Sequence, residues 1–245
     1  MLARVVAELI AAGVPALAGY MAWGVRGRSS EVFGRSVWRG PSARRALALT
    51  FDDGPSESTP KLLDLLAEYG ARATFCVLGF HTRRLPRVVR RLVAEGHEIA
   101  NHSDTHPTLY LRSGEFIAAQ VGRAQETIAQ TAGIAPRFFR APYGARWFGL
   151  AAAQEKHGLT GLMWTAIASD WRLSAPEIAA RMQARTRPGA VFCFHDGREL
   201  AQDPDISSTL GALACLLPAW RKAGYELIPA GEMFPAISPA VVSTP

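Results

Sequence analysis

Short apolar runs alternate with helix-like segments along the chain from residue 46 onward, and this alternation constrains the fold more than any other feature. Repeated strand–helix alternation predicts parallel strands joined by right-handed crossovers, and nearly continuous apolar strands are typical of a sheet buried on both faces. The 245 residues therefore predict one large α/β domain with about seven parallel strands, as a barrel or as an open doubly wound sheet. The predicted strands are residues 46–51, 73–79, 98–103, 137–142, 159–167, 190–196 and 225–230.

The segments between these runs carry the start and stop signals of helices. Pro60 follows Ser58 and Thr59 at the start of one segment, and Gly70 marks its end. Ser174 and Glu177 form a capping-box pattern at the start of another. The other predicted helices are residues 86–95, 116–132 and 210–223.

The N-terminal part of the chain lies outside this pattern. Residues 5–25 form an apolar stretch whose one charge is Glu8, and as a helix it is about as long as a bilayer's hydrocarbon core is thick. We expect a membrane anchor or a signal peptide here, with a soluble amphipathic helix that caps the domain as the alternative. The expected division of the chain is an apolar N-terminal helix at 1–25, a linker at 26–44, the α/β domain at 45–232 and a C-terminal tail at 233–245.

The location of the protein depends on that N-terminal stretch. An anchor or a signal peptide places the domain in the cell envelope, membrane-anchored or secreted. Basic residues after the stretch favour a cytoplasmic orientation instead, by the positive-inside tendency. These residues are Arg26, Arg28, Arg35 and Arg39. The two indications conflict, so the sequence leaves both locations open.

The composition is basic, with a formal net charge of +6. This charge either covers solvated helix faces or attracts an anionic surface or polymer. No recognition motif accompanies it, so we expect no nucleic-acid partner. The three cysteines form no C-x-x-C pair, and we expect neither a disulfide nor a cysteine metal ligand.

Polar side chains follow the predicted strands where the strands end, which is where active sites form in parallel α/β folds. His102 and His106 are four positions apart and converge on one ion in a helix or a tight turn. Asp52 and Asp53 repel each other unless a cation lies beside them. Each pattern alone also fits surface histidines or a capping turn, but together they predict a divalent metal with one aspartate as ligand and its neighbour as base. His195 suits a general acid.

Five ordered segments resemble the polysaccharide deacetylases of the NodB-homology type, carbohydrate esterase family 4. These segments are TFDDGP (50–55), HSDTH (102–106), RAPYG (140–144), SDW (169–171) and FHD (194–196), and the resemblance covers about residues 45–232. It implies a distorted (β/α) barrel and a metal-dependent hydrolase that removes N-acetyl groups from an amino-sugar polymer or oligomer, such as peptidoglycan or chitin.

The resemblance also implies a role for each matching residue. Asp53, His102 and His106 are expected to hold the metal, which is usually zinc and sometimes cobalt or nickel. The other implied roles are general base for Asp52, partner of that base for Arg140, general acid for His195, partner of that acid for Asp170, an oxyanion-binding backbone N–H for Tyr143, and walls of the acetyl pocket for Trp171 and Phe194.

The chain departs from the family pattern at two positions. Phe194 stands where the family often has leucine, and Ile167 where it often has a second aspartate. A bulkier wall at Phe194 is expected to narrow or reshape the acetyl pocket.

Other activities stay open on the same residues. They are an O-acetyl esterase, a small-amide hydrolase, a phosphoesterase and a non-catalytic carbohydrate-binding relative. A phosphoesterase needs a second metal site, and the sequence indicates no second carboxylate–histidine cluster. A non-catalytic relative is expected to lose Asp52 or a ligand, and this chain keeps all of them. The substrate is expected to be a carbohydrate, and the oligomeric state stays open.

Residues beside these segments carry further expectations. We expect Asp104 to stabilise the loop between the two histidines, with a fourth oxygen ligand of the metal as the alternative. His81, His97 and His157 are expected to be surface or capping residues. Tyr110 and Trp147 are expected either to stack on a sugar ring or to pack under a loop.

Overall fold

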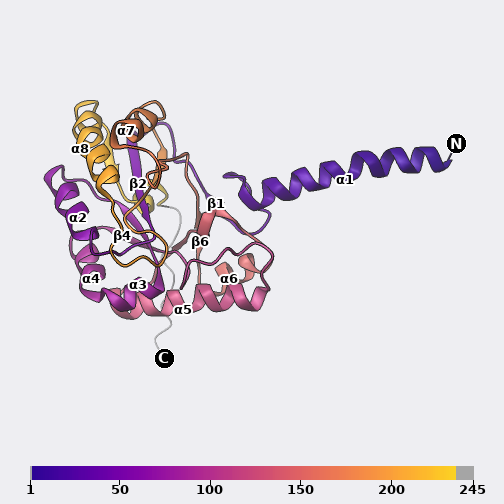
Figure 1. The fold of residues 1–245 in the computed structure, drawn as a ribbon, viewed down its shortest axis with the longest axis horizontal. Coiled ribbons are helices and arrows are strands. Elements are labelled where there is room, and N and C mark those ends of the chain that lie inside the picture. Colours follow the sequence, from indigo (N-terminus) through magenta and orange to yellow (C-terminus); the bar gives the residue numbers. More distant parts are fainter. Residues whose placement is uncertain (1, 236–245) are drawn as a thin grey trace.

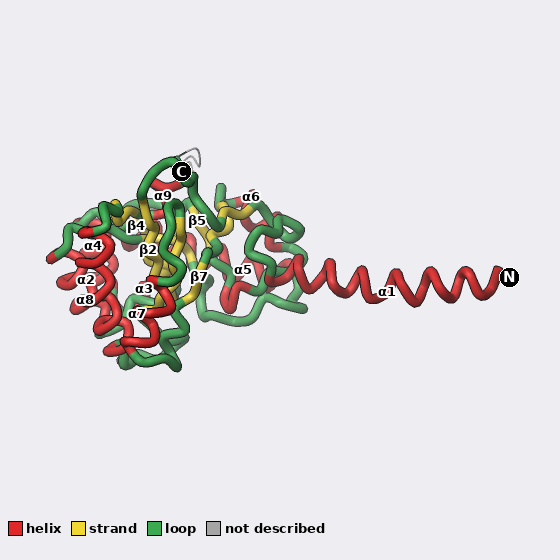
Figure 2. Tube along the Cα trace, turned by 90° about the horizontal axis from the view of Figure 1, so that it is seen from above, coloured by secondary structure: helices red, strands yellow, loops and turns green. Residues whose placement is uncertain are grey.

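The computed structural model describes residues 2–235, with side chains from residue 13 onward, and shows a parallel sheet curved into an open, distorted barrel with helices outside it (Figures 1 and 2). The strands are β1 (Ser36–Val37), β2 (Ala46–Asp52), β3 (Thr74–Val77), β4 (Glu98–Asn101), β5 (Phe138–Phe139), β6 (Thr160–Leu162), β7 (Ala166–Ile167), β8 (Ala190–His195) and β9 (Glu226–Ile228). The α-helices are α1 (Leu2–Arg26), α2 (Thr59–Glu68), α3 (Gly79–Arg84), α4 (Pro86–Ala94), α5 (Gly114–Ala132), α6 (Leu150–Lys156), α7 (Ala175–Gln183), α8 (Ser207–Lys222) and α9 (Ala230–Met233), and a short 3₁₀ helix spans Pro142–Gly144. The expected barrel is confirmed.

The sheet follows the order β1-β6-β5-β4-β3-β2-β8-β7, and all its pairs are parallel. Strand β9 lies off this path and pairs with the first half of β2, whereas β3 pairs with the second half. Strand β6 pairs with β1 and β5 near one end of the strand order, and β7 pairs with β8 at the other end. The chain runs directly from β6 to β7 and so crosses the opening of the barrel, where no strand pair closes the sheet. The parallel arrangement brings the C-terminal strand ends to one rim.

Two stretches of chain differ from the expected elements. The run 159–167 contains two strands, because the chain changes its partner strand between them. The N–H of Met163 donates to Val37 O in β1 at 2.7 Å, whereas that of Thr165 donates to Val191 O in β8 at 2.8 Å. The segment 26–44, expected as a linker, contributes β1 and so joins the sheet beside β6.

The core divides by the alternation of side chains along each strand. On β2, Leu47, Leu49 and Phe51 face the helices and belong to the largest buried cluster, which α2, α4, α7 and α8 complete. Ala46 and Ala48 face the barrel interior, where small side chains of several strands meet. Thr50 and Asp52 follow Ala46 and Ala48 on the same inward face of β2, so Asp52 lies inside the barrel at its rim.

The N-terminal helix α1 projects away from the barrel (Figures 1 and 2). Its last turn is docked: Val25 is buried against Phe33, and the main-chain N–H of Arg146 donates to Val25 O at 3.1 Å. The Arg146 guanidinium also donates to the main-chain oxygens of Gly27 and Ser30. Residues 25–33 are therefore part of the domain's packed structure.

The sequence predicts a membrane anchor or signal peptide at the N-terminal end and a tail at the C-terminal end. None of the described helices is long and apolar enough to cross a membrane. The anchor or signal peptide at 1–25 stays a prediction. Of the expected tail at 233–245, residues 236–245 lie outside the described residues.

Candidate active site

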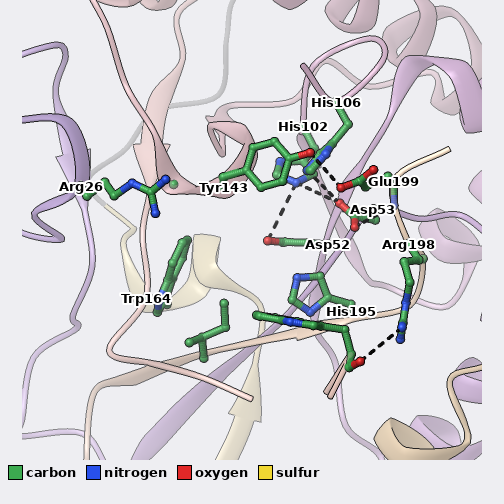
Figure 3. Close-up of a pocket in the computed structure, with 14 residues that line it drawn as sticks. Arg26, Asp52, Asp53, His102, His106, Tyr143, Trp164, His195, Arg198 and Glu199 are labelled. Carbon is green, nitrogen blue, oxygen red and sulfur yellow. Dashed lines mark hydrogen bonds and ion pairs between the residues drawn. The ribbon is translucent and has the colours of Figure 1, made fainter. Parts of the chain in front are cut away.

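The rim of the barrel opens into a pocket of about 530 Å³ (Figure 3). Asp52 ends β2, His195 ends β8 and His102 follows β4, so three strands position three chemical groups around it. The lining residues are Arg26, Asp52, Asp53, His102, His106, Tyr143, Gly144, Trp164, Ile167, Trp171, His195, Gly197, Arg198 and Glu199. The expected metal ligands, base and acid therefore share one cavity.

The three expected metal ligands lie side by side in the upper part of Figure 3. Asp53 Oδ1 lies 3.3 Å from His102 Nε2 and 3.1 Å from His106 Nε2. His102 Nδ1 lies 2.7 Å from the main-chain oxygen of Arg140, so Nδ1 carries the proton and the Nε2 lone pair faces Asp53. Two imidazole nitrogens and a carboxylate oxygen thus converge on one small space.

Burial makes this cluster fit a cation. In the part of the chain that the structure describes, Asp53 Oδ1 is buried without a hydrogen-bond donor, which is costly for a carboxylate unless a cation lies beside it. Burial and the neighbouring His102 lower the pKa of His106 to about 4, so its imidazole is neutral, as a ligand must be. The second oxygen of Asp53, Oδ2, accepts the N–H of Glu199 at 2.9 Å, which fixes the carboxylate. These residues fit one divalent metal ion.

Backbone strain gathers at the same place. Left-handed φ values are uncommon for non-glycine residues and persist only where the surrounding structure holds them. Among residues 2–235, four non-glycine residues with positive φ line the pocket: Asp53, His106, Tyr143 and Glu199. Two more lie next to site residues: Ser103 follows His102, and Ser169 precedes Asp170, the partner of His195. One further such position, Leu111, lies elsewhere. These loops therefore hold backbone conformations that cost energy, and they do so where they position the residues of the site.

Asp52 is held by a buried ion pair. Arg140 is fully buried, and its Nη1 donates to Asp52 Oδ1 at 2.6 Å and to Thr50 Oγ1 at 2.7 Å. Burial raises the pKa of Asp52, but the charge of Arg140, with smaller contributions from His102 and His195, more than offsets it and holds that pKa below its ordinary value. Asp52 is therefore ionised and oriented, as a general base must be.

His195 is held by a second carboxylate. Its Nδ1 lies 2.7 Å from Asp170 Oδ1, and its main-chain N–H donates to Asp170 Oδ2 at 2.8 Å. Burial lowers the pKa of His195, but Asp170 and the two aspartates at the end of β2 more than offset it and raise that pKa to about 9. The imidazole is protonated at neutral pH, which is the state of a general acid.

Replacing Asp170 by Asn is expected to move the alkaline limb of the pH–rate profile downward. A group with a raised pKa keeps its proton below that pKa and loses it as the pH rises, so the wild-type limb falls near pH 9. Without the negative charge the limb shifts by roughly 1–3 pH units toward acid. The measurement is kcat/KM against pH.

The control removes a hydrogen bond and keeps the charge. Thr209 Oγ1 donates to Asp170 Oδ2 at 2.8 Å, so Thr209→Val tests this hydrogen bond alone and is expected to move the limb less. An unchanged limb in Asp170→Asn would remove Asp170 as the partner of the acid.

A second group of potential metal ligands adjoins the first. It consists of Asp52, Cys193 and His195, and no motif in the sequence marks these three as a cluster. Arg140 and Asp170 already bind its charged members. Burial and Asp52 raise the pKa of Cys193 well above its ordinary value, so the sulfur is a neutral thiol and a poor ligand. This second group suits proton transfer better than a second cation.

Two of the three expected substrate contacts lie in the pocket, and the third does not. Tyr143 and Trp171 line it, and the Trp171 ring stands perpendicular to that of His195 with centroids 5.1 Å apart. Phe194 is fully buried and stacks on Phe51 in the outer core, 5.7 Å between centroids. The expectation that Phe194 forms the acetyl wall is wrong, because successive strand side chains face opposite ways and His195 faces the pocket. Ile167 and Trp171 supply apolar surface instead.

Some pocket residues were not expected. Glu199 holds Asp53 through its N–H, accepts a hydrogen bond from the Tyr143 hydroxyl at 2.8 Å, and its main-chain oxygen lies 2.8 Å from His81 Nε2. His81 is fully buried, so its expected surface position is wrong, and its place just after the β3 run was the available signal. Arg26 and Trp164 carry no motif that marks them.

The remaining expectations are resolved outside the pocket. Asp104 pairs with Arg83 and Arg123 and stabilises the histidine loop as expected. His97 is buried and accepts the N–H of Ala73, so its expected surface position is also wrong. His157 caps α6 as expected. Tyr110 and Trp147 pack on each other at 4.7 Å between centroids.

The fold and the site together define a class of protein. A parallel barrel carries at its rim an Asp-His-His cation site, an aspartate paired with arginine and a histidine paired with aspartate. Such a combination of a metal site, a base and an acid in one pocket is that of a metal-dependent hydrolase.

Comparison with known proteins gives the family. The chain belongs to the polysaccharide deacetylase family, whose model matches residues 39–162. A chitooligosaccharide deacetylase of Bradyrhizobium sp. (strain ANU 289) is 36% identical over 201 residues, which cover 78% of this chain and 92% of that protein. A peptidoglycan-N-acetylglucosamine deacetylase of Bacillus cereus is 31% identical over 200 residues, which cover 81% of this chain and 71% of that protein. A solved peptidoglycan N-acetylglucosamine deacetylase superposes with a TM-score of 0.75 at 31% identity, over 81% of this chain and 92% of that one.

Proposed function

We propose that this protein is a metal-dependent hydrolase that removes N-acetyl groups from an amino-sugar polymer or oligomer. The observation that carries the proposal is the presence in one pocket of an ionised, arginine-paired Asp52 and a protonated, aspartate-paired His195 beside three convergent metal ligands. Amide hydrolysis needs these three elements together, because water must lose a proton and the amine must gain one. The likeness to named chitooligosaccharide and peptidoglycan deacetylases supports the amino sugar.

The residues divide the reaction between them. A bound divalent ion supplies Lewis-acid polarisation of the acetyl carbonyl. Asp52 accepts a proton as the oxygen of water bonds to the acetyl carbon. His195 donates its proton to the sugar nitrogen as the carbon–nitrogen bond breaks, which leaves acetate and a free amine. The backbone N–H of Tyr143, a residue that lines the pocket, is proposed to bind the developing negative oxygen.

The acetyl methyl is proposed to lie against Ile167 and Trp171. Both line the pocket beside His195, and Trp171 is held because its main-chain oxygen accepts a hydrogen bond from Arg198. A small apolar surface favours acetyl over longer acyl groups by a modest factor, since each further methylene changes binding by about 1–3 kcal/mol.

Zinc is the proposed metal, with cobalt or nickel as replacements. Two imidazoles and one carboxylate are a donor set that zinc accepts with open positions for substrate. The proposed site of action is the cell envelope, because peptidoglycan, the substrate in the name of one relative, is an envelope polymer.

The experiment compares two acetylated substrates that differ in whether nitrogen or oxygen carries the acetyl group. A chitooligosaccharide carries N-acetyl groups, and an O-acetylated glucan oligomer of equal length carries esters. Purified, zinc-loaded protein is expected to release acetate faster from the amide than from the ester. Release from the ester alone would replace the proposal by an O-acetyl esterase on the same residues.

A further inference from the structure

The pocket has an end that the proposed reaction does not use. Arg26, the last residue of α1, lines it together with Trp164. In Figure 3 its guanidinium lies on the side away from Glu199 and Arg198. Arg26 is exposed, and among residues 13–235 it has no hydrogen-bond or ion-pair partner. A cation without a protein partner therefore faces the space in which a substrate binds.

The backbone that carries Arg26 is fixed. Gly27 N–H donates to Trp23 O at 2.7 Å, and the Arg146 guanidinium binds the main-chain oxygen of Gly27 on the other side. Val25, the preceding residue, is buried at 7% exposure and accepts the Arg146 N–H. The backbone of Arg26 is thus held by an ordered turn, so binding of a ligand restricts only the conformations of the Arg26 side chain.

Charge is distributed unevenly along the pocket. Its acidic lining residues are Asp52, Asp53 and Glu199: Asp53 belongs to the metal site, Glu199 supports it, and Asp52 is paired with Arg140 as the base. Arg198, the second lining arginine, donates to the main-chain oxygen of Trp171. Tyr143 lies between Arg26 and the metal ligands in Figure 3, and Trp164 lies below Arg26; such aromatic faces suit a sugar ring. The pocket offers an acetamido site at one end and a free positive charge at the other.

We propose that Arg26 binds an anionic oxygen group, a carboxylate or a phosphate, that the substrate carries beside the acetylated sugar. The proposal rests on the proposed deacetylase function and narrows its substrate class. A guanidinium binds both anions through two parallel N–H donors. A volume of about 530 Å³ exceeds the need of one acetamido group. The protein is therefore selective for anionic glycans over neutral chitooligosaccharides.

The experiment uses three acetylated substrates of equal length and the zinc-loaded full chain. One is a neutral chitooligosaccharide, one carries a carboxylate on the neighbouring sugar as peptidoglycan fragments do, and one carries a phosphate at its reducing end. Arg26→Gln is expected to raise KM for at least one anionic substrate about tenfold, because a charge-assisted contact is lost. The variant's kcat/KM for the neutral substrate is expected to stay within about twofold, since the metal site is untouched.

Two further variants control for charge and geometry. Arg26→Lys keeps the charge but not the paired donors, so its KM is expected to lie between those of wild type and Arg26→Gln. Arg39→Gln removes an exposed arginine of the same segment that does not line the pocket, and is expected to leave every KM unchanged.

The distribution of the KM loss identifies the anion. A loss confined to the carboxylate substrate identifies a carboxylate site, and one confined to the phosphate substrate a phosphate site. An equal loss on the neutral and anionic substrates, or no loss on any, would overturn the assignment of Arg26.

Binding without turnover separates this inference from the proposed function. Calorimetry of the metal-free chain with the same carboxylate and phosphate oligosaccharides is expected to show about tenfold weaker binding of at least one of them in Arg26→Gln than in wild type. Equal binding by the two proteins overturns the anion site. Absence of acetate release from all three substrates in zinc-loaded wild type, together with weaker binding in Arg26→Gln, overturns the deacetylase and leaves the anion site standing.

Discussion

Asp52→Asn is expected to lower kcat for acetate release by about 10²–10⁴-fold while the metal stays bound. Asp52 is not among the three convergent ligands, and its Oδ2 lies 4.0 Å from His102 Nε2. The amide oxygen of asparagine still accepts a hydrogen bond from Arg140 but takes no proton from water. The measurements are kcat and zinc content of the same preparation.

Stability has to be followed in the same variant. The substitution leaves the buried Arg140 without a counter-charge, and removal of one partner from a buried pair costs about 3–5 kcal/mol. A melting curve of the variant is measured to establish that it is folded at the assay temperature. Asp64→Asn is the matched control, because Asp64 pairs with Arg91 on the surface and lies outside the pocket. Activity of Asp52→Asn within tenfold of wild type would remove Asp52 as the base.

His102→Ala is expected to weaken metal binding by at least about 100-fold, since even the residues that orient ligands contribute 10–100-fold. The substitution removes one nitrogen donor and leaves Arg140 O without its buried partner. Acetate release is expected to fall with metal occupancy, and excess zinc is expected to restore part of it. The measurement is zinc affinity by competition with a chelator.

A histidine distant from the pocket provides the comparison. His157 caps α6 and does not line the pocket, so His157→Ala is expected to keep wild-type affinity. Unchanged zinc binding in His102→Ala would contradict the assignment of the metal site, whatever happened to activity.

Most of the fold follows from side-chain burial that the sequence displays. Strands β2 and β8 are almost wholly buried, so their apolar runs are long and their polar ends stand out. That is why the residue pattern alone is enough to place Asp52 and His195 at the rim. Strand β1 has two residues and depends on pairing with β6, a tertiary contact that no local pattern reports.

The sequence predicted the residues that carry the metal site, the base and the acid, and it missed contacts that depend on the backbone or on distant parts of the chain. Glu199 holds Asp53 through a main-chain N–H, which leaves no trace in residue type. Phe194 was misplaced although the alternation along β8 puts it on the face opposite His195. Arg26 was missed because its position depends on how the N-terminal turn docks on Arg146, about 120 residues along the chain.

The metal-dependent deacetylase activity is tested most directly by a metal titration of the stripped protein, with acetate release from a chitooligosaccharide as the readout. Zinc is removed with a chelator and returned in measured steps, with cobalt and nickel in parallel series. We expect no release from the stripped chain, and release that rises in proportion to bound metal and saturates at one ion per chain. Full acetate release from chain that contains no metal, or saturation with one bound ion and no release, would contradict this expectation.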